Sequence, residues 1–190
     1  MKRIFALAAV AVFCWAGLAY ADHESDATCH VYVEVDANIG VLAMAPFFDL
    51  GSVQTGEFTG TIPFRVDANT QKVRIGAAAS HLYKGDDPDS VHVDPILLCA
   101  GDDAGIIIIP HNGNPVGGHS PLALFEEQPV MIDGFPGRQT ETIVFESAQN
   151  NHFSQQVDLV ICWDQDDPEK PMGEYSGKVQ MYAWIVLPGV

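Results

Sequence analysis

The chain has 190 residues, of which 47% are apolar, and a formal net charge of −16 at pH 7. Its length suits one domain that buries a core of its own. The strong negative charge disfavours nucleic acid and anionic membrane surfaces as partners, because like charges repel. We therefore expect a globular domain that binds no nucleic acid.

The first 21 residues have the composition of a secretion signal. Lys2 and Arg3 precede an apolar run over residues 4–18, and residues 19–21 read Ala-Tyr-Ala, the small-x-small pattern of a signal-peptidase site. The run is shorter than the ~20 residues that a membrane-spanning helix needs, so we expect cleavage after Ala21 and no membrane insertion afterwards. Cleavage leaves 190 − 21 = 169 residues, and the loss of two basic residues changes the net charge from −16 to −18.

A strand-like pattern follows the signal. Apolar residues alternate with small or polar ones, so an extended chain here would have one apolar face. The apolar positions are Cys29, Val31, Val33, Val35, Ala37, Ile39 and Val41. Strands usually have about 5–6 residues, and this pattern is about twice as long. Either the segment bends and serves two sheets, or its first half leaves its own domain and completes another.

Further strands are expected along the rest of the chain. Residues 62–66 and 73–77 alternate on either side of turn-forming residues 67–70, which predicts a hairpin. Residues 95–99 and 106–109 are nearly continuous apolar runs, typical of strands buried on both faces. The remaining candidate strands are residues 129–133, 140–146, 156–163 and 178–187, and one helical turn is expected near residues 122–127. Many strands without intervening helices predict an all-β antiparallel sandwich.

Two segments resemble those of a known family. Segment 172–181 reads Met-Gly-Glu-Tyr-Ser-Gly-Lys-Val-Gln-Met, and it resembles the Gly-x-Tyr-Ser-Gly approach to the final strand of chaperone–usher pilins. Segment 64–73, Phe-Arg-Val-Asp-Ala-Asn-Thr-Gln-Lys-Val, is similar to the second-strand hairpin of such subunits. The resemblance extends to the order of elements across the mature chain, and it points to the archaic, spore-coat-U-like or alpha-class groups.

The resemblance implies an incomplete immunoglobulin-like β-sandwich that lacks its last strand. A periplasmic chaperone, and then the N-terminal extension of an identical or related subunit, would fill the resulting groove by adding a strand. Residues 22–37 would form the extension and residues 38–190 the pilin domain. The donor strand would seat Val31, Val33 and Val35, and the acceptor groove would be lined by Val179, Met181, Ala183 and Ile185.

The function that follows from the resemblance is a structural subunit of an extracellular fimbria on the cell surface, with a role in adhesion. It would be secreted through the periplasm, and an outer-membrane usher would be a further partner. The alternative is a secreted monomeric β-sandwich module that binds a carbohydrate or a protein, with its N-terminal strand completing its own sandwich. The two differ in whether residues 30–36 pair with a neighbour or with residues 179–187 of the same chain.

The mature chain would hold an odd number of cysteines, because Cys14 leaves with the signal. Export favours oxidation, and one pair among the remaining three leaves one thiol free. Cys99 and Cys162 each end an expected strand and precede an acidic loop, so we favour a disulfide between them. A bond from Cys29 to either one is the alternative.

No motif predicts an enzyme, a cofactor or a metal site. His92, Asp94, His111 and His119 lack the close spacing of zinc or copper ligands. The acidic segments 86–89, 102–103 and 164–167 lack the spacing of a calcium loop. The neighbours Ser80-His81 and His119-Ser120 occur without a Gly-x-Ser-x-Gly elbow, so we predict no catalytic residue.

Overall fold

The computed structural model describes residues 29–101, 104–110, 122–148 and 151–186. Every strand pairing within these ranges is antiparallel, and they contain no α-helix. The all-β antiparallel class expected from the sequence is therefore confirmed, while the immunoglobulin-like assignment stays a prediction.

Twelve strands make up the described chain. They are β1 (Ile39–Ala43), β2 (Gly56–Ala68), β3 (Lys72–Ser80), β4 (Tyr83–Lys84), β5 (Leu97–Leu98), β6 (Gly105–Pro110), β7 (Ala123–Ile132), β8 (Phe135–Thr140), β9 (Ile143–Glu146), β10 (Phe153–Gln165), β11 (Tyr175–Ser176) and β12 (Val179–Ile185). The main path of hydrogen-bonded neighbours is β1-β2-β10-β6-β7-β8-β3-β12. In addition, β5 pairs with β10, β9 pairs with β3, and β11 pairs with β4.

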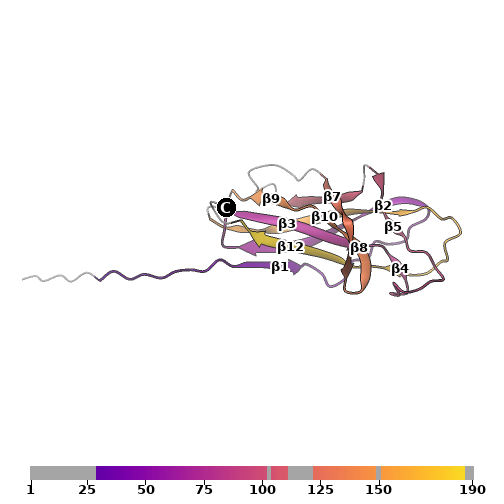
Figure 1. Cartoon of the computed structure of the whole chain (residues 1–190), viewed down its shortest axis with the longest axis horizontal. Coiled ribbons are helices and arrows are strands. Elements are labelled where there is room, and N and C mark those ends of the chain that lie inside the picture. Colours follow the sequence, from indigo (N-terminus) through magenta and orange to yellow (C-terminus); the bar gives the residue numbers. More distant parts are fainter. Residues whose placement is uncertain (1–28, 102–103, 111–121, 149–150, 187–190) are drawn as a thin grey trace, which may run out of the picture. The chain divides into compact units, whose positions relative to one another are not determined.

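The path is open, and its two ends are the first and last long strands of the domain. β7 joins its two halves, because the start of β7 pairs with β6 and the remainder pairs with β8. The strands β1 and β12 lie next to each other without a ladder between them, and their arrows point in opposite directions (Figure 1).

One hydrophobic core lies between the inward faces of both halves. β10 alternates strictly, so that every second side chain from Phe153 to Trp163 faces inward and all of these except Gln155 are apolar. The indole Nε1 of Trp163 donates a 3.0 Å hydrogen bond to the carbonyl oxygen of Ser80, which joins β10 to the end of β3. The period-two pattern expected for residues 156–163 thus marks the central strand of the core.

The expected hairpin between residues 62–66 and 73–77 is wrong. Both segments are strands, but β2 pairs with β1 and β10, whereas β3 pairs with β8, β9 and β12. Residues 69–71 therefore carry the chain from one half to the other. Alternation and turn residues are local signals, and they do not specify which strands pair.

Other local predictions also need correction. Neither strand that was expected to be buried on both faces is so, since Ile107 of β6 is 37% exposed and Leu97 of β5 is 47% exposed. Residues 123–127 belong to strand β7 and not to a helical turn. β3 and β10 contain their expected segments, whereas β2 and β7 begin at Gly56 and Ala123, well before the expected residues 62 and 129. Residues 140–146 are divided between β8 and β9, and β8 was not expected apart from its last residue.

The chain divides into two compact units, Met1–Val35 and Asp36–Val190. In the first unit, the described residues 29–35 form no strand. In the second unit, β1 begins at Ile39, where the sequence led us to expect the domain's own first strand.

A disulfide joins Cys99 to Cys162, the pairing that the sequence favoured, with 5.4 Å between the Cα atoms. Cys29 is a free, exposed thiol. The disulfide ties the segment after β5 to β10 across a sequence separation of 63 residues. Such a closure restricts the unfolded chain and so stabilises the folded one.

Replacing both Cys99 and Cys162 by Ala should remove roughly 3–5 kcal/mol of stability by the loop-entropy relation. For a domain of this size the melting temperature should fall by roughly 6–20 °C. Calorimetry of the variant beside Cys29→Ser, which removes a thiol outside the disulfide, measures the effect. Equal melting temperatures for the two variants would contradict this role.

Candidate functional site: the open seam between β1 and β12

The segment that precedes β12 fixes where that strand begins. A Cβ on Gly177 would lie 2.6 Å from the Ser80 Oγ and 2.7 Å from the His81 carbonyl oxygen, so only glycine fits there. The Ser80 Oγ accepts a 2.8 Å hydrogen bond from the backbone N–H of Lys178 and donates one of 2.7 Å to the His81 carbonyl oxygen. Buried Ser80 thereby sets where the last strand begins beside β3.

β12 presents an apolar face to the core, as the sequence predicts. Val179, Met181, Ala183 and Ile185 alternate with Gln180, Tyr182 and Trp184. Met181 is 6% exposed, but the other three inward residues are only half-buried. On the adjacent strand β3, the corresponding inward side chains of Val73, Ile75, Ala77 and Ala79 are fully buried. Burial therefore decreases toward the outer edge of β12.

β1 has the same incomplete burial at the other end of the path. Ile39 is half-buried, Val41 is 37% exposed and Ala43 is exposed, although the facing residues of β2 are buried. Among the described residues, β1 pairs only with β2, and β12 pairs only with β3. We call these two edges, Ile39–Ala43 and Val179–Ile185, the β1–β12 seam.

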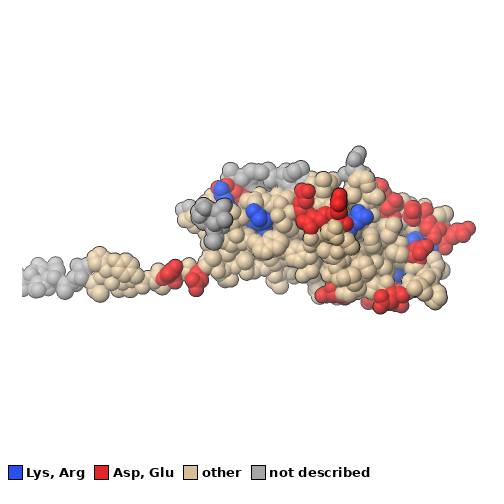
Figure 2. Space-filling view, in the orientation of Figure 1, with Lys and Arg blue, Asp and Glu red and all other residues tan. Residues whose placement is uncertain are grey.

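The surface along the seam is poorly charged. In Figure 2 few Lys, Arg, Asp or Glu side chains lie over β1 and β12, and acidic side chains gather toward the end of the domain where β4 and β5 lie. The seam thus combines unpaired backbone edges with apolar side chains, which is the combination that accepts an added strand.

The predicted donor residues are exposed within their own unit. Val31 and Val33 are each 87% exposed and Val35 is 78% exposed. Val179, Met181, Ala183 and Ile185, by contrast, lie together on one face of one strand, as expected.

The loop between β1 and β2 adds an apolar surface that the sequence reading missed. Phe47 is 81% exposed, and Met44 and Phe48 are about half exposed. Leu50 instead packs inward, where its side chain occupies the space that a Cβ on Gly60 would need, beside Trp163. The loop has no periodic pattern of apolar residues that would have predicted this surface. The sequence signal for the close packing of Leu50 is Gly60, because a glycine inside an alternating strand often marks a place where another part of the chain approaches closely.

No catalytic arrangement forms at Ser80 and His81. The Ser80 hydroxyl is engaged with two backbone groups, while the His81 Nδ1 accepts a 3.0 Å hydrogen bond from the backbone N–H of Leu98. Burial, and secondarily the charge of Arg138, lowers the pKa of His81. Both side chains therefore serve to hold strands together.

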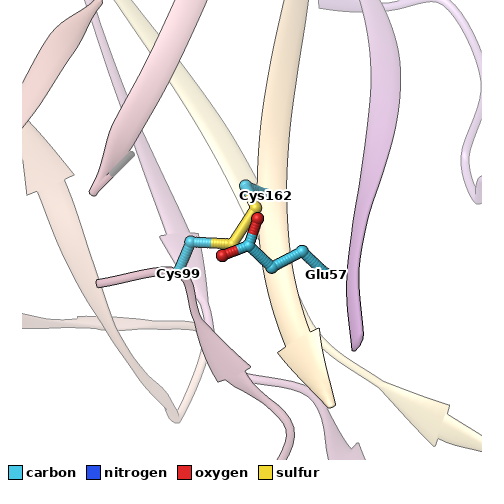
Figure 3. A group of neighbouring side chains, drawn as sticks. All are labelled: Glu57, Cys99 and Cys162. Atoms are coloured by element: carbon cyan, nitrogen blue, oxygen red, sulfur yellow. A yellow bond between two sulfur atoms is a disulfide. The ribbon is translucent and has the colours of Figure 1, made fainter. Parts of the chain in front are cut away.

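Among the described residues, the group of side chains that could formally hold a metal is Glu57 with the two disulfide cysteines (Figure 3). The Glu57 carboxylate lies beside Cys99 and Cys162, but the two sulfur atoms are bonded to each other and so supply no thiolate ligand. His111, His119, Ser120 and Asp102-Asp103 lie outside the described residues. His92 and Asp94 form no group with other ligand side chains among the described residues.

The acidic loops are shaped by their own hydrogen bonds. Asp87 accepts a bond from the backbone N–H of Asp89, and Asp167 accepts one from that of Glu169. Asp86 accepts a hydrogen bond from the Ser176 hydroxyl, which links the loop to β11. These contacts identify Asp86, Asp87 and Asp167 as loop and turn formers.

Comparison of the chain with family models, with curated proteins and with solved structures finds no match. The described residues contain no helix that is long and apolar enough to cross a membrane.

Replacing Ala183 by Phe should overpack the inward face of β12, at a cost of about 1–3 kcal/mol to any strand that enters the seam. We expect roughly tenfold slower uptake of a synthetic peptide of residues 22–37 by the compact unit 36–190. The matched control is Gln180→Ala, on the opposite face of the same strand. Equal uptake rates for the two variants would contradict the register.

The lowered pKa of His81 predicts an acid-sensitive stability. The contribution of His81 to the free energy of unfolding should be complete above the usual pKa of 6.5 and should decrease as the pH falls below that value. Below it, the unfolded chain binds a proton at His81 that the folded chain does not bind. Urea denaturation between pH 8 and pH 5.5 measures this. His81→Asn keeps an acceptor near Leu98 but does not titrate, so a parallel pH dependence in this variant would refute the assignment.

Proposed function

We infer that this protein is a structural subunit of an extracellular fimbria, assembled by donor-strand complementation and serving surface adhesion. The observation that carries the proposal is the open β1–β12 seam, with one unpaired edge on each side. The same chain holds an apolar strand pattern at residues 29–35 that is not part of any described sheet. Residues 29–35 could therefore supply a strand, and the β1–β12 seam could accept one.

The donor and the seam correspond in length. β12 has seven residues, with inward side chains at Val179, Met181, Ala183 and Ile185. Residues 29–35 also number seven, with Cys29, Val31, Val33 and Val35 on one face. At roughly 3.3 Å per residue, such a donor spans about 23 Å, the length of β12. Each seated Val would contribute about 1.5–3 kcal/mol by burial, in addition to the backbone hydrogen bonds.

The compartment is consistent with the proposal. Disulfides persist in oxidising environments, and the chain contains one. The N-terminal 21 residues have the form of a secretion signal. A newly exported subunit with an apolar seam would be prone to aggregate, so we propose a periplasmic chaperone as its partner before assembly. The resemblance to pilins adds an outer-membrane usher as a further proposed partner.

Val33→Asp should abolish assembly, because its carboxylate would be buried in an apolar seam at a cost of several kcal/mol. The compact unit 36–190 does not include this position, so the domain should still fold. Electron microscopy and size-exclusion chromatography of residues 22–190 measure the effect. Glu34→Ala, which changes the next residue on the opposite face, should assemble normally.

Fibres of normal length from the Val33→Asp protein would exclude this donor strand. A wild-type protein that stays monomeric, with residues 29–35 protected from hydrogen exchange, would instead identify a self-completed binding module.

A further inference from the structure

Asn69 holds the backbone where the compact unit begins. Its Nδ2 donates a 2.8 Å hydrogen bond to the carbonyl oxygen of Asp36, and its Oδ1 accepts one of 2.7 Å from the N–H of Asn38. The backbone N–H of Asn69 also donates to the carbonyl oxygen of Asn38 at 3.1 Å. Together these bonds extend the β1–β2 ladder beyond its last pair, Ile39 and Ala68.

The loop that carries Asn69 is anchored independently. The Nε2 of Gln71 donates a 3.2 Å hydrogen bond to the carbonyl oxygen of Ser147, and the N–H of Ser147 donates one of 2.8 Å to the Gln71 carbonyl oxygen. At the end of β2, the Ser154 hydroxyl donates to Asp67, which also accepts from Arg65. These hydrogen bonds hold the loop in place, so the Asn69 side-chain amide has a fixed position from which it bonds to residues 36–38.

A chain with this sequence could also fold its own donor strand into the seam. Only residues 36–38 separate Val35 from Ile39, and three-residue loops are common hairpin connections. Such loops favour a left-handed third residue, and Asn, here Asn38, tolerates that conformation.

The register of such a hairpin would be favourable. Pairing Val35 with Ile39 would place Val33 opposite Val41 and Val31 opposite Ala43, because directly opposed residues share a face. All three donor valines would then point into the subunit's own core. Self-insertion would bury the same side chains as insertion of a neighbour's strand.

The hairpin and the Asn69 contacts exclude each other. A turn over residues 36–38 has to rotate the Asp36 carbonyl and the Asn38 N–H away from the Asn69 amide. We propose that Asn69 is a clamp that prevents a subunit from completing itself and so directs its N-terminal strand to a second copy of this chain. The proposal rests on the proposed function. It makes the Asn69 side-chain amide the group that decides between a self-completed monomer and a polymer.

The test compares residues 22–190 of the wild type with Asn69→Ala, Asn69→Asp and the control Gln71→Ala. Gln71→Ala removes a side-chain amide bond from the same loop but leaves residues 36–38 held. Size-exclusion chromatography gives the ratio of monomer to polymer. Hydrogen–deuterium exchange of the monomer fraction reports whether residues 29–35 are protected.

Asn69→Ala should raise the ratio of monomer to polymer about tenfold, since two hydrogen bonds that oppose the hairpin are lost. Its monomer should also protect residues 29–35 from exchange. Asn69→Asp retains the acceptor for Asn38 and loses the donor to Asp36, so it should lie between Asn69→Ala and the wild type. Gln71→Ala should match the wild type.

The clamp is refuted if Asn69→Ala and Gln71→Ala show the same ratio and the same exchange, or if the wild-type monomer already protects residues 29–35. A wild type that never polymerises, together with a compact unit that takes up no peptide, would refute the proposed function instead. The exchange comparison between the two Ala variants would still decide the clamp in that case.

Discussion

Unpaired backbone groups at two strand edges are the constraint on which the rest of this structure depends. A buried N–H or carbonyl without a hydrogen-bond partner is costly, so an open sheet edge must face water, be covered or receive a strand. β1 and β12 are such edges, and they lie next to each other with apolar side chains facing inward. β1 and β12 approach within 8 Å of each other at their Cα atoms, whereas a strand paired on both sides needs about 9.6 Å between its two neighbours. A single added strand would therefore satisfy both edges once β1 and β12 move apart.

Several features of the domain determine the shape of this seam. Gly177 and Ser80 fix where β12 starts against β3, because their close approach admits no side chain at residue 177. Leu50 packs against Gly60 and Trp163. It therefore covers the part of β2 that precedes Phe64–Ala68, the residues that pair with β1. The inward side chains of β1 and β12 are thus less buried than the side chains of β2 and β3 that they face.

The sequence predicted the strands and faces better than it predicted their partners. Alternation of apolar residues is a local property, and it located β10, β12 and the start of β1 correctly. Pairing depends on contacts distant in sequence, which is why the hairpin expected around residues 67–70 became a crossover between the two halves. The pairing of Cys99 with Cys162 was favoured because both were expected at one end of the fold. Asn69 looked like an ordinary turn residue, since its bonds to residues 36–38 exist only once β1 pairs with β2.

Burial alone does not decide between self-completion and exchange, because both bury the same valines. An intramolecular strand has an effective concentration of order mM on a short linker, which favours the monomer over dilute neighbours. Two hydrogen bonds to Asn69 oppose this by about 1–3 kcal/mol, which is roughly a 5- to 150-fold shift. The clamp can therefore offset much of the proximity advantage, and a high local concentration of subunits would supply the rest. On this account the geometry of three linker residues determines which copy receives the strand, while the apolar pattern determines only that a strand is received.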